Sequence, residues 1–154
     1  MLAIVQFLHI LSGTVWAGSA ILFTFVIEPA LLSVDDVVAD PVRAAIGRHA
    51  PRLMAPSGIL LLLTGIGRVA LGGAISSFAD LGSAYVLWAA LALAITLAVT
   101  ISGGRYRARV DALLAQRGDP RAELKTMWRR QSVVTGIGVL AIIGIMTILG
   151  LGLY

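Results

Sequence analysis

The sequence predicts an all-α membrane protein, a bundle of four transmembrane helices with both termini on the outer side of the membrane. Three observations lead to this prediction. The 154-residue chain is 58% hydrophobic and only 13% charged, with a mean hydropathy of +0.94, which is typical of an integral membrane protein. Four segments have the roughly 20 apolar residues that a helix needs to cross a bilayer. The basic residues gather in two of the connections between these segments.

The first predicted span runs over residues 3–31 and contains no charged residue before Glu28. Its apolar run could be mistaken for a secretory signal peptide, with residues 16–20 in the place of the cleavage site. It lacks a basic segment at its start, however, and stays apolar to Leu32, so we expect a retained helix. The other spans are predicted at residues 54–75, 83–103 and 132–153. Because the four spans take up most of the chain, we expect a single transmembrane domain over residues 1–154.

The charged residues predict the orientation of the bundle. Every basic residue except Arg68 lies in residues 33–52 or 104–131, whereas residues 74–82 contain Asp80 and no basic residue. Connections rich in Lys and Arg stay in the cytoplasm. Both termini are therefore expected on the periplasmic or extracellular side, in a multi-pass protein of a bacterial inner (plasma) membrane.

The two basic connections are expected to lie at the level of the lipid headgroups. Residues 104–131 interleave charged and apolar side chains, which predicts a partly helical segment broken at Gly118-Asp119-Pro120. Residues 36–50 predict a short interfacial helix that begins near Asp40 and Pro41. Contact with anionic lipid explains this charge better than a nucleic-acid site does. We therefore expect the lipid bilayer as a partner and no nucleic acid.

The sequence lacks the residues that several kinds of catalytic and metal-binding site require. The chain has no cysteine, which excludes disulfides, thiolate metal sites and thiol redox chemistry. It contains no Ser/His/Asp set, no pair of carboxylates within a span, and no glycine loop between a strand and a helix that would cradle a phosphate. The sequence therefore assigns no catalytic residue and leaves open whether the protein is an enzyme.

Polar residues inside the predicted spans are the candidates for function, because they are costly in hydrocarbon. A helix rises about 1.5 Å per residue, which predicts that His9, Arg68 and Met146 lie in one layer, in the outer third of the membrane. Helical spacing places Trp16 on the same stripe of the first helix as His9. A flat cofactor lying against His9 would meet this aromatic side chain. The alternative is a helix face that only packs against its neighbours.

His49 and Glu28 are predicted to lie toward the other face of the membrane. About 30 Å of helix separates His49 from the layer of His9, so the two histidines should not bind one metal ion or one haem. His49 is expected among the headgroups. Glu28 is expected at the same interface, where it caps the interface or pairs with Arg48 or Arg52, and a proton relay is its alternative role.

The first helix carries a family resemblance. A histidine followed seven residues later by tryptophan and then by small residues, as in FLHILSGTVWAG at residues 7–18, resembles the first helix of CopD-like copper-resistance membrane proteins and of HemJ-type protoporphyrinogen oxidases. Similar segments of these families match residues 25–31, 62–65 and 129–133. The resemblance implies that the first-helix histidine, here His9, binds haem or copper. HemJ-type proteins also carry a lysine in the third helix, and residues 85–104 contain none.

We therefore expect a small integral membrane protein that binds haem b through His9 and has a redox or metal-handling role. Trp16, Arg68 and Met146 complete the predicted cofactor site, because an arginine could neutralise a propionate and haem iron accepts His/Met axial pairs. Copper, with His9 as the metal ligand, is the second cofactor considered, although few imidazole or sulfur ligands face the outer side. Two alternatives stay open. One is a copper transport component, and the other is an accessory or assembly subunit that forms a homo-oligomer or joins a larger respiratory or metal-handling membrane complex.

Overall fold

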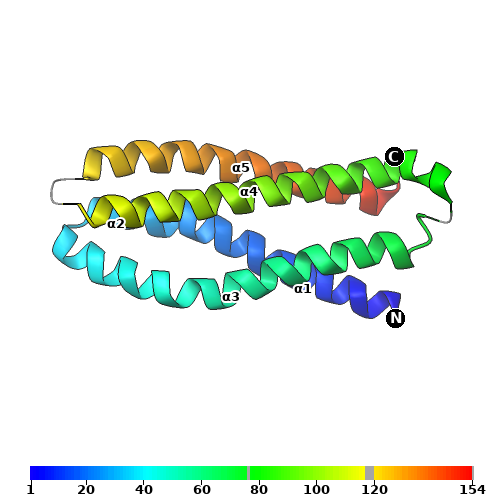
Figure 1. Ribbon diagram of the computed structural model, residues 1–154, viewed down its shortest axis with the longest axis horizontal. Helices are drawn as coiled ribbons and strands as arrows, with labels where there is room; N and C mark the ends of the chain where they lie inside the picture. Colours follow the sequence, from blue (N-terminus) through cyan, green and yellow to red (C-terminus); the bar gives the residue numbers. More distant parts are fainter. Residues whose placement is uncertain (76, 117–119, 154) are drawn as a thin grey trace.

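The computed structural model describes residues 1–75, 77–116 and 120–153, and within these ranges the chain is helical, with no strand. Four helices are long and apolar enough to cross a membrane. This confirms the coarse prediction of an all-α protein with four candidate spans. The first and last described residues lie at one end of the bundle, and the turn at residues 33–36 and the facing ends of the last two long helices lie at the other (Figure 1). We call these the termini end and the basic end.

The described residues form seven helical elements. The first candidate span consists of α1 (Leu2–Leu22), a π-helical turn η1 (Phe23–Ile27) and α2 (Glu28–Ser33). The others are α3 (Asp36–Leu71), a short 3₁₀ helix η2 (Phe78–Gly82), α4 (Ala84–Leu114) and α5 (Arg121–Leu151). Within the bundle α1 packs mainly on α3, and α4 packs mainly on α5. The fold is thus two helix pairs laid against each other.

The helices at the basic end are longer than the predicted spans. Residues 33–52 were expected to be a connection with a short helix near Asp40, but α3 begins at Asp36 and continues through Pro41, Pro51 and Pro56. Asp35 has the extended backbone of an N-cap residue, and Asp36 places an acid in the first turn, both of which favour a helix start at this point. Prolines inside a helix bend it, and α3 is bowed along its length (Figure 1).

The connection predicted at residues 104–131 is also mostly helical. Charged residues lower the hydropathy beyond residue 103 without ending the helix, so α4 continues to Leu114 and α5 already begins at Arg121. Of the predicted break, Gly118 and Asp119 lie outside the described residues, and Pro120 directly precedes α5.

At the termini end, α3 stops at Leu71, four residues before the predicted boundary. Gly73 there has a φ of +73°, a left-handed conformation that glycine adopts without strain.

A small core joins the two helix pairs at mid-length. Trp16, Val99 and Val139 are buried there against one another. Two glycines allow this close packing. A Cβ at Gly58 would lie 3.4 Å from Trp16 Cδ1, and a Cβ at Gly138 would collide with Val99 Cγ2. Most other large apolar side chains are exposed, as expected for helices whose outer faces contact lipid.

One hydrogen bond ties the π-helical turn η1 to α5. In this turn the N–H of Glu28 bonds to the carbonyl of Phe23, and the following residue, Pro29, has no N–H to donate. The Thr24 carbonyl is thereby left without a helical donor. The indole Nε1–H of Trp128 donates to it over 2.7 Å. The bond links the first and last spanning helices near the basic end.

Glu28 joins three helices at the same end. It is half-buried, and the Tyr106 hydroxyl of α4 donates a hydrogen bond to its carboxylate. The guanidinium groups of Arg43 and Arg107, from α3 and α4, lie within electrostatic range of the same carboxylate. We call Glu28, Arg43, Tyr106 and Arg107 the Glu28 cluster.

The predicted partners of Glu28 were wrong. Arg48 and Arg52 are exposed, because continuous helix through this region turns them away from the bundle. Arg43 points inward instead, with a side chain that is 11% exposed, and its Nη1 lies 3.2 Å from Asp40 Oδ1. A predicted loop could not show which arginine faces α2, since that choice depends on the helical register of α3.

Candidate functional site

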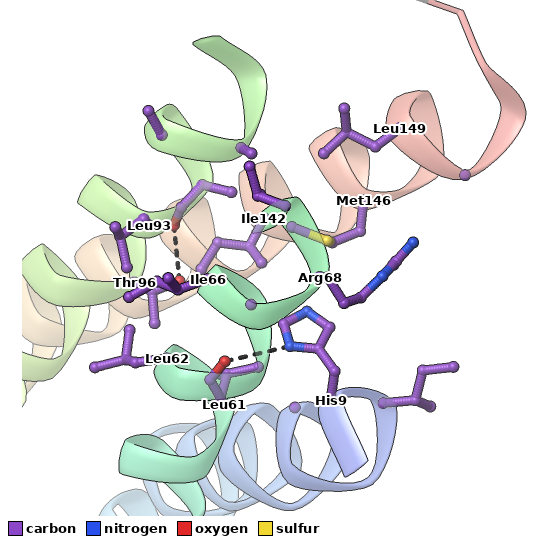
Figure 2. A pocket seen from close by; sticks show the side chains of 18 of the residues that line it. His9, Leu61, Leu62, Ile66, Arg68, Leu93, Thr96, Ile142, Met146 and Leu149 are labelled. Carbon is purple, nitrogen blue, oxygen red and sulfur yellow. Dashed lines mark hydrogen bonds between the residues drawn. The ribbon is translucent and has the colours of Figure 1, made fainter. Parts of the chain in front are cut away.

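A cavity of about 760 Å³ lies between the two helix pairs in the half of the bundle nearer the termini. All four spanning helices line it, and its volume falls within the range of about 300–1,000 Å³ that is common for small-molecule and cofactor sites. Its lining is mostly apolar, with side chains such as Leu62, Leu93 and Ile142. His9, Arg68 and Met146 lie together toward one end of it (Figure 2).

His9 is held by α3 through one of its two ring nitrogens. Its Nδ1 lies 3.2 Å from the Leu61 carbonyl oxygen and 3.1 Å from Thr64 Oγ1. A carbonyl can only accept a hydrogen bond, so Nδ1 must carry the proton. The Thr64 hydroxyl donates its own proton to the Leu60 carbonyl over 2.6 Å, which leaves its oxygen free to accept from Nδ1. In a neutral ring, Nε2 then carries the lone pair.

The lone pair on Nε2 is available to a ligand. No hydrogen bond among the described residues involves this atom. An imidazole that donates from one nitrogen to a carbonyl and offers the other is the usual arrangement of a metal-binding histidine. Gly65 leaves space for the ring, because a Cβ there would lie 3.2 Å from His9 Cε1. Two neighbouring residues of α3, Thr64 and Gly65, therefore position the ring.

Arg68 and Gln6 bring two further polar groups to the cavity. Arg68 lies within electrostatic range of the His9 ring. Its Nε and the Oε1 of Gln6 are both buried without a hydrogen-bond partner. By contrast, the threonine hydroxyls that line the cavity bond to carbonyls of their own helices, as Thr96 does to Ala92 over 2.8 Å. In the described part of the chain, no group forms such a hydrogen bond with Arg68 Nε or Gln6 Oε1.

Met146 and Trp16 complete the set of residues that the sequence singled out. Met146 extends from α5, and Figure 2 shows its sulfur at the same end of the cavity as Arg68. Trp16 lines the cavity from α1 but is only 5% exposed, so most of its surface packs in the core. The four predicted site residues thus line one cavity. That they bind a cofactor stays a prediction.

Sequence reasoning missed three contributors to this site: the Leu61 carbonyl, the Thr64 hydroxyl and the Gln6 side chain. Thr64 and Gly65 belong to the segment at residues 62–65 that carries part of the family resemblance. Gln6 could have been found from helical spacing alone, because it lies one turn before His9 on the same helix face.

His49 lies apart from this cavity, as predicted from the length of helix that separates it from the layer of His9. It is exposed and lines a smaller hollow of about 270 Å³ between α1 and α3, with side chains such as Phe23 and Met54. Its Nδ1 lies 2.8 Å from the Ala45 carbonyl oxygen, one turn earlier in its own helix. Nowhere in the described ranges do three or more His, Cys, Asp or Glu side chains come together as a group that could hold a metal ion.

Comparison with known proteins adds no family to this geometry. No protein-family model, no curated protein and no solved structure matches the chain. The resemblance to CopD-like and HemJ-type proteins therefore rests on the residues quoted for it.

Proposed function

We propose that this protein binds haem b in the cavity between its helix pairs, with His9 Nε2 as an axial ligand of the iron, and that it has a redox or metal-handling role in the membrane. The observation that carries the proposal is the fixed ring of His9, whose Nδ1–H is bonded to α3 and whose Nε2 is left open. A haem held there would supply a one-electron iron couple. Met146 is the candidate for the second axial position, because it brings a thioether to the same cavity.

The cavity suits an amphiphilic cofactor. An apolar lining accommodates a macrocycle, while the cation of Arg68 at one end suits an acidic side group. Copper fits less well. A bare copper ion takes several imidazole or sulfur ligands from the protein, and His9 is the one histidine in a cavity that has no cysteine. Haem iron needs fewer ligands from the protein, since the porphyrin itself supplies four donor atoms. The ligand set therefore favours haem over copper.

The proposal is tested by the absorption spectrum of purified protein in mild detergent, before and after reduction with dithionite. Protein expressed with ample haem should show a Soret band and, when reduced, sharp α and β bands. His9→Ala should lose them, while the matched control His49→Ala, outside the cavity, should keep them. Helical circular dichroism and extraction yield would show that both variants fold. A featureless wild-type spectrum, or one that His9→Ala leaves unchanged, would refute the assignment.

We also propose that the basic end faces the cytoplasm of a bacterial inner membrane and that both termini lie outside. Exposed basic residues gather at that end, among them Arg105, Arg109, Lys125 and Arg129, and such residues are retained in the cytoplasm. The absence of cysteine makes the test direct. A membrane-impermeant maleimide added to intact cells should label Ala3→Cys and not Ala122→Cys. The reverse pattern would overturn the orientation.

A further inference from the structure

Gln6 has no part in the haem proposal as it stands, although it lines the cavity one turn from His9. We infer that Gln6 and Arg68 together bind a carboxylate of the cavity's ligand, so that the site selects a porphyrin with free acid groups. This inference rests on the proposed function. It adds Gln6 as a binding residue and names the chemical class of ligand that the cavity prefers.

The first argument is the placement of unsatisfied polar atoms. Only three buried side-chain N or O atoms of the described residues lack a hydrogen-bond partner: Gln6 Oε1, Arg68 Nε and Arg43 Nε. The first two belong to residues that line this one cavity. Arg43 already has Asp40 as an ion-pair partner, whereas none of the ion pairs between described residues involves Arg68. A buried polar atom without a partner is costly, and in a bilayer little water is at hand to satisfy it.

The second argument is proximity. A Cβ at Gly67 would lie 3.5 Å from Val5 Cγ1, so the segment of α3 that carries Arg68 packs against the segment of α1 that carries Gln6. Arg68 is also within electrostatic range of His9. Gln6, His9 and Arg68 therefore form one polar end in a cavity whose other walls are mainly apolar.

The chemistry of the two side chains narrows the ligand. A guanidinium donates charge-assisted hydrogen bonds, and a carboxylate is its best-matched acceptor. A half-turn of its terminal amide lets Gln6 donate an N–H to the same carboxylate. A neutral apolar ligand would leave both groups as they stand, unpaired. A ligand with a flat apolar body and an acidic edge would satisfy them while Nε2 of His9 reaches its iron.

The test compares two ligands that differ only in their acid groups. Ligand-free protein in detergent is titrated with haem and with iron protoporphyrin IX dimethyl ester, in which both propionates are esterified, and the Soret band is followed. Wild-type protein should bind haem at least about tenfold more tightly than the diester, the usual size of a hydrogen bond to a charged group. Arg68→Met should abolish most of this preference, and Gln6→Leu should reduce it by about threefold.

The diester serves as the folding control, because both variants should bind it as tightly as wild-type protein does. Arg105→Met, at the basic end, should keep the full preference for haem. Equal affinity of wild-type protein for haem and diester would overturn the inference but leave the haem proposal standing, and so would an unchanged preference in Arg68→Met. If the protein shifts or sharpens the Soret band of neither ligand, the proposed function itself fails.

Discussion

The two ends of the bundle differ in how their polar groups are satisfied. At the basic end, groups on one helix are satisfied by groups on another: the Thr24 carbonyl by Trp128, Glu28 by Tyr106, and Asp36 by Arg121 over 3.1 Å. Toward the termini, His9 Nδ1 also bonds across to α3, but the buried Nε of Arg68 and Oε1 of Gln6 have no hydrogen-bond partner beside the cavity. The difference indicates that cross-helix bonds at the basic end hold the bundle together, whereas the termini end keeps space for a ligand.

This comparison predicts that the largest loss of stability follows from a change at the Glu28 cluster. Glu28→Gln keeps an acceptor for the Tyr106 hydroxyl but removes the negative charge that faces Arg43 and Arg107. Because removing one of two opposite buried charges is strongly destabilising and Glu28 is only half-buried, we expect a cost of about 1–3 kcal/mol in the free energy of unfolding. Unfolding in detergent followed by circular dichroism would measure it.

The matched control is Asp111→Asn, an exposed acid on α4, for which we expect a change of less than about 0.5 kcal/mol. Glu28→Gln should also leave haem binding unchanged, since the Glu28 cluster and the cavity lie in different halves of the bundle. A variant as stable as wild-type protein would mean that the cluster does not hold the basic end together.

A smaller effect is expected at the bond between α5 and the π-helical turn. Trp128→Phe keeps an aromatic ring but removes the indole N–H that donates to the Thr24 carbonyl. We expect a loss of about 1 kcal/mol, near the usual value of a hydrogen bond inside a membrane protein. Trp88→Phe on α4 is the control, because the Trp88 side chain makes no hydrogen bond with the described residues. Equal thermal stability of the two variants would contradict this account of η1.

The sequence predicted the fold class and the placement of the cavity residues, but not the contacts between helices. Hydropathy identifies apolar spans, and the constant rise of a helix converts residue number into depth, which is why His9, Arg68 and Met146 were expected in one layer. The bond from His9 to the Leu61 carbonyl depends on how α1 and α3 are rotated against each other. No single-chain periodicity specifies that rotation, and Thr64 was therefore overlooked.

The errors at the basic end have a different cause. Hydropathy marks where a helix leaves the apolar layer, not where its backbone hydrogen bonds stop, so continuous helix at residues 36–52 was interpreted as a connection. The wrong partner for Glu28 followed from this. An arginine in a loop can lie anywhere nearby, whereas in a helix only those on the inner face, such as Arg43, reach the bundle.

The smallest change in stability and the most specific change in binding are expected at Thr64. Thr64→Val keeps the shape of the side chain and removes one of the two acceptors that hold His9 Nδ1. The Leu61 carbonyl still accepts the proton, so the free energy of unfolding should fall by less than about 1 kcal/mol. Haem affinity should fall by about tenfold, the lower end of the range for residues that orient a metal-binding histidine. The control is Thr147→Val, because Thr147 lines the cavity and its hydroxyl bonds to the Ile143 carbonyl of its own helix. Titration of both variants with haem separates the two roles: equal losses would show that the cavity, and not the orientation of His9, determines affinity.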